Sequence, residues 1–217
     1  MGAPTRPEPW QPPSPLPCRR ETPRLVLRWL EPGDAPSLVA ALDEDRSSFE
    51  PWLPWVKLDN RNEAEAVFNA EKFRRERERT DPPADNFVMT IADRSSGEVV
   101  GGTGFHRLVS PWHEAEIGYW VRPSRRGQGV CTEAVAHLID WAFEPPSAGG
   151  WGFRRIHIQC AALNVASRRV PEKLGVPLES NRLLQRWEDG LGWCDALGFG
   201  VTAEAWAARV SRAGRSS

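Results

Sequence analysis

The sequence lacks an excess of charge of either sign. Its 217 residues include 28 Lys plus Arg and 29 Asp plus Glu, which gives a net charge of −1 at pH 7. Proteins that coat nucleic acids normally carry a basic excess, so we expect no direct binding of nucleic acid. The sequence also lacks an apolar run of the ~18–20 residues that a membrane span needs, and its first residues form no hydrophobic signal segment. We therefore expect a cytoplasmic protein that does not bind membranes.

Cysteine is scarce and scattered. Cys18, Cys131, Cys160 and Cys194 form no C-x-x-C pair, and no histidines stand at metal-ligand spacing. These absences predict that the protein has no metal site. Without a secretion signal, buried thiols are a better interpretation of the even count than two disulfides.

Length and composition favour one domain with extensions at both ends. A chain of 217 residues with 40% apolar residues has enough material for one core. Seven of the first 17 residues are proline, which cannot build a hydrogen-bonded ladder. We therefore predict a flexible proline-rich arm over residues 1–21, one domain over residues 22–203, and a short helix with a frayed tail over residues 204–217.

Apolar periodicity and turn residues predict alternating strands and helices along this domain. The expected strands span residues 25–30, 87–92, 99–107, 114–121 and 155–161, with a final antiparallel pair that ends near residue 201. The expected helices span residues 35–42, 62–79, 132–143 and 165–174. This order predicts an α/β protein with one mixed, mostly antiparallel central sheet flanked by helices.

A glycine-containing loop joins an expected strand to an expected helix at Arg126-Gly127-Gln128-Gly129-Val130-Cys131. Glycine lets the backbone bring N–H groups against an anion, and the helix adds its positive N-terminal end. The spacing is neither the Rossmann G-x-G-x-x-G nor a P-loop. One charge at a helix end gains only ~0.3–1 kcal/mol, whereas micromolar binding needs about 8 kcal/mol. The loop therefore suits a large phosphorylated cofactor that makes other contacts too, and a purely structural turn is the alternative.

Three segments, in this order along the chain, resemble a known family. Glu50-Pro51-Trp52-Leu53-Pro54-Trp55 is similar to the RimJ/RimL-type branch of that family, which acetylates the N-termini of ribosomal proteins. The run from Ala115 through Ala134 looks like the acetyl-CoA-binding segment of the GNAT superfamily of N-acetyltransferases, and residues 164–175 look like the segment that follows it. The resemblance spans about residues 22–201 and implies the GNAT fold, with acetyl-CoA as cosubstrate.

The resemblance also implies which residues hold the cosubstrate. Backbone N–H groups would bind the pyrophosphate, from Arg126, Gly127, Gln128, Gly129, Val130, Cys131 and Thr132. Cys131 departs from the smaller residue that the family pattern has there. The strand end near Val121 would pair with the pantetheine arm as an extra strand would, since an open edge offers matching donors and acceptors. Asn164 would bind the same arm, and a helix N-cap is its alternative role.

The implied reaction is direct attack of a neutral amine on the thioester carbonyl carbon. Proximity supplies ~7–11 kcal/mol of the barrier, so positioning outweighs any single proton transfer. We expect Glu116 to act as the base through water, with Glu114 on the same face as its substitute. A solvated strand carboxylate is the alternative for Glu116. Pro171 stands where many relatives have a tyrosine acid, so Ser167 is the expected acid, and an ordinary helix-start serine is the alternative.

Aromatic residues supply the candidate acceptor pocket. We expect Trp52, Trp55 and Trp120 to form its walls, with His106 and Trp112 as weaker candidates, and core packing is the alternative for each.

The expected function is acetyl transfer to a primary amine, above all the N-terminal amine of a protein. A small-molecule amine (an amino sugar, a polyamine or an amino acid) and a non-catalytic acyl-CoA-binding module remain alternatives. The tryptophan-rich stretch over residues 187–193 leaves a homodimer open.

Overall fold

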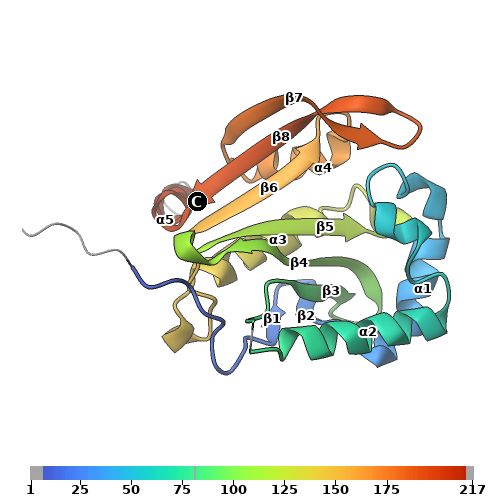
Figure 1. Ribbon diagram of the computed structural model, residues 1–217, viewed down its shortest axis with the longest axis horizontal. Helices are drawn as coiled ribbons and strands as arrows, with labels where there is room; N and C mark the ends of the chain where they lie inside the picture. Colours follow the sequence, from blue (N-terminus) through green and yellow to red (C-terminus); the bar gives the residue numbers. More distant parts are fainter. Residues whose placement is uncertain (1–6, 81, 214–217) are drawn as a thin grey trace, which may run out of the picture.

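The computed structural model describes residues 7–80 and 82–213, which form one eight-stranded sheet with helices on both faces (Figure 1). The strands are β1 (Arg19–Glu21), β2 (Leu25–Trp29), β3 (Phe87–Asp93), β4 (Val99–Val109), β5 (Glu114–Val121), β6 (Arg155–Ala161), β7 (Leu178–Glu188) and β8 (Gly192–Thr202). The α-helices are α1 (Ala35–Asp43), α2 (Glu63–Arg77), α3 (Val130–Phe143), α4 (Val165–Lys173) and α5 (Ala203–Ala213).

The sheet has the strand order β1-β2-β3-β4-β5-β6-β8-β7. Every neighbouring pair is antiparallel except β5 and β6, which run parallel. The parallel step occurs where the chain leaves the sheet after β5, passes through α3 and returns as β6, because a parallel connection needs a long crossover. The predicted mixed, mostly antiparallel sheet with flanking helices is confirmed.

Each face of the sheet has its own hydrophobic core. Phe87, Phe105 and Ile117 point to one face, where they pack with the apolar side of α3. Val88 and Trp120 point to the other face and pack against α1 and α2. This division follows from the strand period of two, which sends neighbouring side chains to opposite faces. The two helical layers therefore make separate surroundings for anything bound to the sheet.

The proline-rich segment is where the structure differs most from the sequence prediction. Residues 7–21 do not form a mobile arm: Trp10 is 6% exposed, stacks on Phe153 at 4.6 Å between ring centroids, and donates a hydrogen bond from Nε1 to the Trp151 carbonyl oxygen at 2.8 Å. Residues 19–21 then form β1, which pairs with β2. Burial of one indole and its hydrogen bond holds the segment in place despite its prolines. Residues 1–6 lie outside the described residues.

The C-terminal part begins as the sequence suggests. A helix, α5, follows β8 directly, and Trp206 donates from Nε1 to Asp140 of α3 at 2.6 Å. The frayed tail predicted at the very end falls largely on residues 214–217, which lie outside the described residues. None of the described helices has the length and apolar character needed to cross a bilayer.

Trp10 should carry a large share of the stability of the N-terminal segment. Trp10→Ala should lower the free energy of unfolding by about 3–5 kcal/mol, because it removes a buried aromatic ring and leaves a cavity. The measurement is urea-induced unfolding. Phe68→Ala is the matched control, since the Phe68 ring is 61% exposed and its loss should cost within about 0.5 kcal/mol. Equal costs for the two variants would contradict the packed segment.

Candidate active site

The parallel pair β5–β6 separates soon after it begins. Only Glu114, Ala115 and Glu116 of β5 have partners on β6, whereas β5 stays paired with β4 as far as Val121. β6 instead follows β8 along its whole length. The two strands therefore diverge toward the end of β5, as Figure 1 shows.

The divergence leaves one side of β5 without a partner strand. Arg122 donates its backbone N–H to Val100 on β4. Since backbone groups alternate sides along a strand, those of Ile117, Tyr119 and Val121 face the open side. An extended ligand with amide groups can pair there as an added strand does. Val121 thus lies on the open side of β5.

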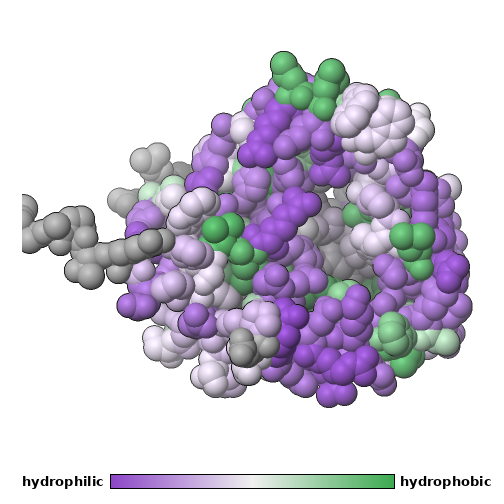
Figure 2. All heavy atoms as spheres, in the orientation of Figure 1, coloured by the Kyte–Doolittle hydropathy of each residue, from purple (hydrophilic) through white to green (hydrophobic). Residues whose placement is uncertain are grey.

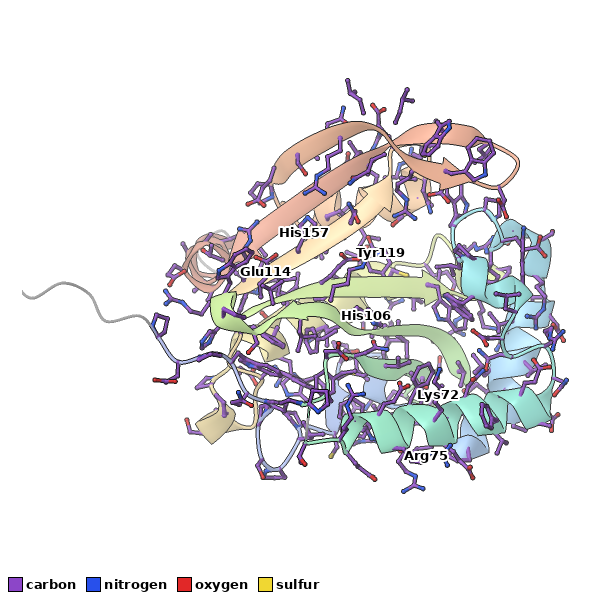
Figure 3. All side chains as sticks on the ribbon, viewed as in Figure 1. Lys72, Arg75, His106, Glu114, Tyr119 and His157 are labelled. Atoms are coloured by element: carbon purple, nitrogen blue, oxygen red, sulfur yellow. The ribbon has the colours of Figure 1, made fainter. Side chains whose placement is uncertain are left out.

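A buried tyrosine, Tyr119, links β5 to the start of α4 where β5 and β6 separate. The Tyr119 hydroxyl donates to the Ser167 carbonyl oxygen at 2.9 Å, and Ser167 Oγ donates to the Tyr119 hydroxyl at 3.3 Å. Burial raises the pKa of Tyr119 above its ordinary value, so this hydroxyl is protonated at neutral pH. Figure 3 places Tyr119 in the region between β5 and β6. Two protonated hydroxyls therefore meet between β5 and the first turn of α4.

The loop after β5 presents a run of free backbone donors. Within the described chain, the N–H groups of residues 127–132 donate to no acceptor, and the next bond is from Glu133 N–H to the Gly129 carbonyl oxygen. Gly127 and Gly129 have φ of 74° and 78°, the left-handed region that glycine adopts without strain. Free N–H groups at the start of a helix such as α3 are the kind of arrangement that favours an anion, for example a phosphate group.

Arg126 corrects the predicted set of donors. Its backbone N–H is not free, because it donates to the Pro123 carbonyl oxygen at 3.1 Å. Its guanidinium turns toward the segment after α1, where it donates to Ser48 Oγ at 2.8 Å and stacks 4.8 Å above the centre of the Phe49 ring. Arg126 thus ties the loop to the α1–α2 segment, and the free donors begin at Gly127.

Residues at and before the start of β2 hold the loop at Gln128 and Glu133. Glu133 accepts hydrogen bonds from Thr22 Oγ1 at 2.6 Å and from the Arg24 backbone N–H at 2.9 Å. Burial alone would raise the pKa of Glu133, but these bonds lower it, so the carboxylate is charged and fully engaged. Arg24 also donates to the Gln128 carbonyl oxygen at 3.0 Å. The start of β2 therefore fixes the backbone that carries the donors.

The cysteines near this loop pack as thiols. All four cysteines are unpaired. Burial raises the pKa of Cys131 to about 12 and that of Cys160 to about 11, so both remain protonated and unreactive at neutral pH. Cys131 packs against the core cluster around α3. The described residues also include no group of three His, Cys, Asp or Glu side chains that could hold a metal ion.

Asn164 and Ser167 lie together at the start of α4. The Asn164 side-chain oxygen accepts a hydrogen bond from the Ser167 N–H at 3.0 Å, so Asn164 is the N-cap of the helix. This is the structural alternative stated for Asn164, and it leaves the amide nitrogen of the side chain for other contacts.

Glu116 and Glu114 both take part in ion pairs. Glu116 lies 3.1 Å from Arg107 Nη1 and 3.9 Å from His157 Nδ1, and Glu114 lies 3.0 Å from Arg155 Nε. Arg107 also donates to Gln159 at 3.1 Å. Both carboxylates therefore belong to a charged row across β5 and β6, close to where the two strands separate.

A cavity of about 330 Å³ lies on the α1–α2 face of the sheet. Two glycines of its lining, Gly102 on β4 and Gly118 on β5, leave room for the rings of Trp120 and His106, because a Cβ would lie 2.3 Å from Trp120 Nε1 and 3.1 Å from His106 Cδ2. Trp55, Trp120 and His106 line the cavity as the sequence suggested; Trp52 does not, and Trp112 is 68% exposed. Figure 2 shows this hollow between the β7–β8 hairpin and α2.

His106 is held in one orientation within this cavity. Its Nδ1 lies 2.5 Å from the Asn86 side-chain oxygen, and its ring lies against Gly118. Burial, with a smaller effect from Arg107, lowers the pKa of His106 to about 4, so the imidazole is neutral at pH 7.

An ion pair links two segments beside the cavity. Lys57 Nζ, at the end of the 3-10 helix η3 (Pro54–Lys57), lies 2.7 Å from Asp189 at the turn of the β7–β8 hairpin. Trp187 and Trp193 of the same hairpin stack edge to face, with ring centroids 5.6 Å apart, and both are exposed.

This geometry agrees with comparisons of sequence and structure. Residues 24–177 match the family model described as an acetyltransferase (GNAT) domain. The chain belongs to the GNAT acetyltransferase family. It is therefore an acetyl-CoA-dependent N-acetyltransferase.

Several relatives carry more specific names. YdaF of Bacillus subtilis, whose name proposes a ribosomal N-acetyltransferase, is 28% identical over 151 residues, which cover 70% of this chain and 76% of YdaF. The ribosomal-protein-serine acetyltransferase of Escherichia coli is 34% identical over 82 residues, or 38% of this chain and 43% of that protein. The solved structure of Mycobacterium smegmatis RimJ in complex with CoA-disulfide superposes with a TM-score of 0.72 at 27% identity, over 88% and 90% of the two chains.

Two features of this GNAT site were missing from the sequence interpretation. Tyr119 was noted only as part of a motif, yet it joins β5 to Ser167. Asn86 was not considered, yet it orients His106. The signal for Tyr119 was available, since it is the only tyrosine in the chain. Nothing in the sequence marks the contact of Asn86 with a residue 20 positions away.

Gly102 should be necessary for the shape of the cavity. A Cβ there would lie 2.3 Å from Trp120 Nε1, so Gly102→Ala should displace the indole and raise KM for the acceptor at least tenfold. Affinity for acetyl-CoA, measured by calorimetry, should stay unchanged. Gly33→Ala is the control, because a Cβ at Gly33 meets nothing within 4 Å. A Gly102→Ala enzyme with an unaltered acceptor KM would show that the acceptor does not use this cavity.

Proposed function

We propose that this GNAT enzyme acetylates the N-terminal amine of a protein. For the binding of acetyl-CoA, the main support is the run of free N–H groups at residues 127–132, which suits the pyrophosphate of this cosubstrate. The open side of β5 near Val121 suits the pantetheine arm, with the Asn164 amide at its far side. Together they would direct the thioester into the divergence between β5 and β6.

The cavity on the α1–α2 face is the proposed acceptor site. Of its lining residues, Asp59 is the only acidic one, and none is a lysine or an arginine. A polyamine would need several carboxylates, because each unpaired ammonium group loses hydration on entering. A protein N-terminus brings one amine, followed by neutral backbone. This single carboxylate is the observation that most favours a peptide acceptor over a polycationic small molecule, in agreement with the names of the relatives.

The proposed reaction is direct transfer. The amine nitrogen attacks the thioester carbonyl carbon, the C–N bond forms, and the electron pair of the broken C–S bond goes to sulfur. Ser167 and Tyr119 are the proposed proton donors to the leaving thiolate, since their hydroxyls meet at the divergence. Glu116 is the base expected from the sequence, acting through water. Trp55 and Trp120 are the proposed acceptor walls, whereas Trp52, also expected from the sequence, does not line the cavity.

The test is CoA release from acetyl-CoA, followed with a thiol reagent. The acceptors are peptides that begin with serine or alanine, the same peptides with a blocked N-terminus and an internal lysine, a polyamine, and an amino sugar. We expect release with the free N-termini and none with the blocked peptides. Release with only the polyamine or the amino sugar would overturn the peptide acceptor while leaving the transferase intact.

The donor site makes a separate prediction about charge. Gln128→Glu places a carboxylate beside the free N–H groups and should raise KM for acetyl-CoA about tenfold, corresponding to about 1.4 kcal/mol of repulsion. The value of kcat should change little. Gln128→Met is the matched control, because it loses the bond to the Ser124 carbonyl oxygen without adding charge.

Steady-state kinetics at low and high salt measure the effect of this added charge. The tenfold increase in KM should become smaller at high salt, because salt screens the repulsion between exposed charges. Equal KM values for Gln128→Glu and Gln128→Met would argue against a phosphate site at this loop.

A further inference from the structure

We propose that His106, rather than Glu116, accepts the proton that the attacking amine releases. This inference rests on acetyl transfer to an amine and does not depend on which amine accepts.

The position of His106 in the sheet brings it to the reacting end of the acceptor cavity. On β4 it pairs in register with Glu116, and its ring extends over Gly118, the next residue on the same face of β5. A Cβ at Gly118 would lie 3.1 Å from the ring carbon Cδ2 and 3.3 Å from Nε2. Glu116 is also the last residue of β5 that pairs with β6. The imidazole thus lies beside the point where the two strands separate, and Figure 3 places His106 next to this part of β5.

The hydrogen bond to Asn86 determines which ring nitrogen is free. A carboxamide oxygen only accepts, so the Asn86 oxygen at 2.5 Å requires the hydrogen of a neutral imidazole to be on Nδ1. Nε2 then carries a lone pair, and it has no partner within the described part of the chain. Since His106 lines the cavity, this lone pair is available to an N–H group of a bound amine.

The surroundings keep the imidazole neutral before the reaction. Burial lowers its pKa to about 4, and the positive charge of Arg107 on the same strand acts in the same direction. Across on β5, the Glu116 carboxylate would oppose this effect, but it is paired with Arg107. His157 on β6 adjoins Glu116, and Asp59 reaches the same cavity from the segment before α2. Asn86, before β3, contributes no charge.

Glu116 is less suited than His106 to accept the proton of the amine. Its carboxylate lies 3.1 Å from Arg107 and 3.9 Å from His157, and Glu116 does not line the acceptor cavity. The Glu116 carboxylate is therefore already engaged by a guanidinium in an ion pair. The same pair turns the Arg107 guanidinium toward Glu116 and Gln159. Glu116 is therefore a positioning residue, which holds Arg107 in place.

The proton balance of the step is simple. As the C–N bond forms, the amine nitrogen becomes positively charged and strongly acidic, so even a weakly basic imidazole can take its proton at Nε2. The C–S bond then breaks and its electron pair goes to sulfur, which receives a proton from the side of Ser167 and Tyr119. The imidazolium then releases its proton to solvent, and solvent returns a proton to the hydroxyl pair that donated to sulfur. The sum is an amide and free CoA, with no other reactant.

The test compares His106→Gln with Glu116→Gln in the full chain, with the best acceptor of the wild-type enzyme. Glutamine keeps hydrogen-bonding atoms but cannot take a proton, so His106→Gln should lower kcat about 10²–10⁴-fold, the usual contribution of a proton-transferring side chain. Glu116→Gln should lower kcat less than tenfold. Both variants should keep the acetyl-CoA affinity of the wild type by calorimetry.

Two further readouts separate proton transfer from a structural role. Added imidazole should restore part of the activity of His106→Gly and none of that of Glu116→Gln. Asn86→Asp places a carboxylate beside Nδ1, which favours the imidazolium and raises the pKa of His106. The acid limb of the kcat–pH profile should therefore move to higher pH.

Three results would overturn the proposal: a His106→Gln enzyme within threefold of wild type, a loss confined to Glu116→Gln, or a fall in acetyl-CoA affinity that accounts for the His106→Gln effect. Failure of the proposed function would look different, because the wild-type chain itself would then release no CoA with peptide acceptors.

Discussion

The separation of β5 from β6 is the constraint on which the rest of the site depends. Three paired residues join the two halves of the sheet, and beyond Glu116 each strand follows a different partner. The divergence exposes one side of β5, gives α4 room to place its first turn beside Tyr119, and leaves the sheet continuous through β4 and β8. A fully paired sheet would be more regular, but it would offer no backbone groups to an extended ligand.

The proposed donor and acceptor sites lie on opposite faces of the same sheet. The loop of free N–H groups opens α3, which belongs to one core, whereas the cavity lies under α1 and α2, which belong to the other. On this second face the rings of Trp120 and His106 occupy the space that side chains at Gly102 and Gly118 would need. Arg126 fastens the two layers together through Ser48 and Phe49.

The sequence predicts local features of this arrangement better than distant ones. The strand, glycine loop and helix around Gly129 are evident from period and turn chemistry, and Asn164 is a helix cap in the structure as its residue type allows. Three contacts that the sequence does not reveal join residues far apart: Trp10 with Trp151, Asn86 with His106, and Tyr119 with Ser167. Such pairs depend on register and packing, which composition and periodicity do not encode.

The ion pair between Lys57 and Asp189 spans the surface beside the proposed acceptor cavity. It connects η3, whose Trp55 lines the cavity, to the turn of the β7–β8 hairpin. For the proposed acceptor, such a bridge of side chains would treat the end of a polypeptide and its middle differently. A terminus would pass it as a single strand, whereas an internal loop would have to enter doubled back on itself.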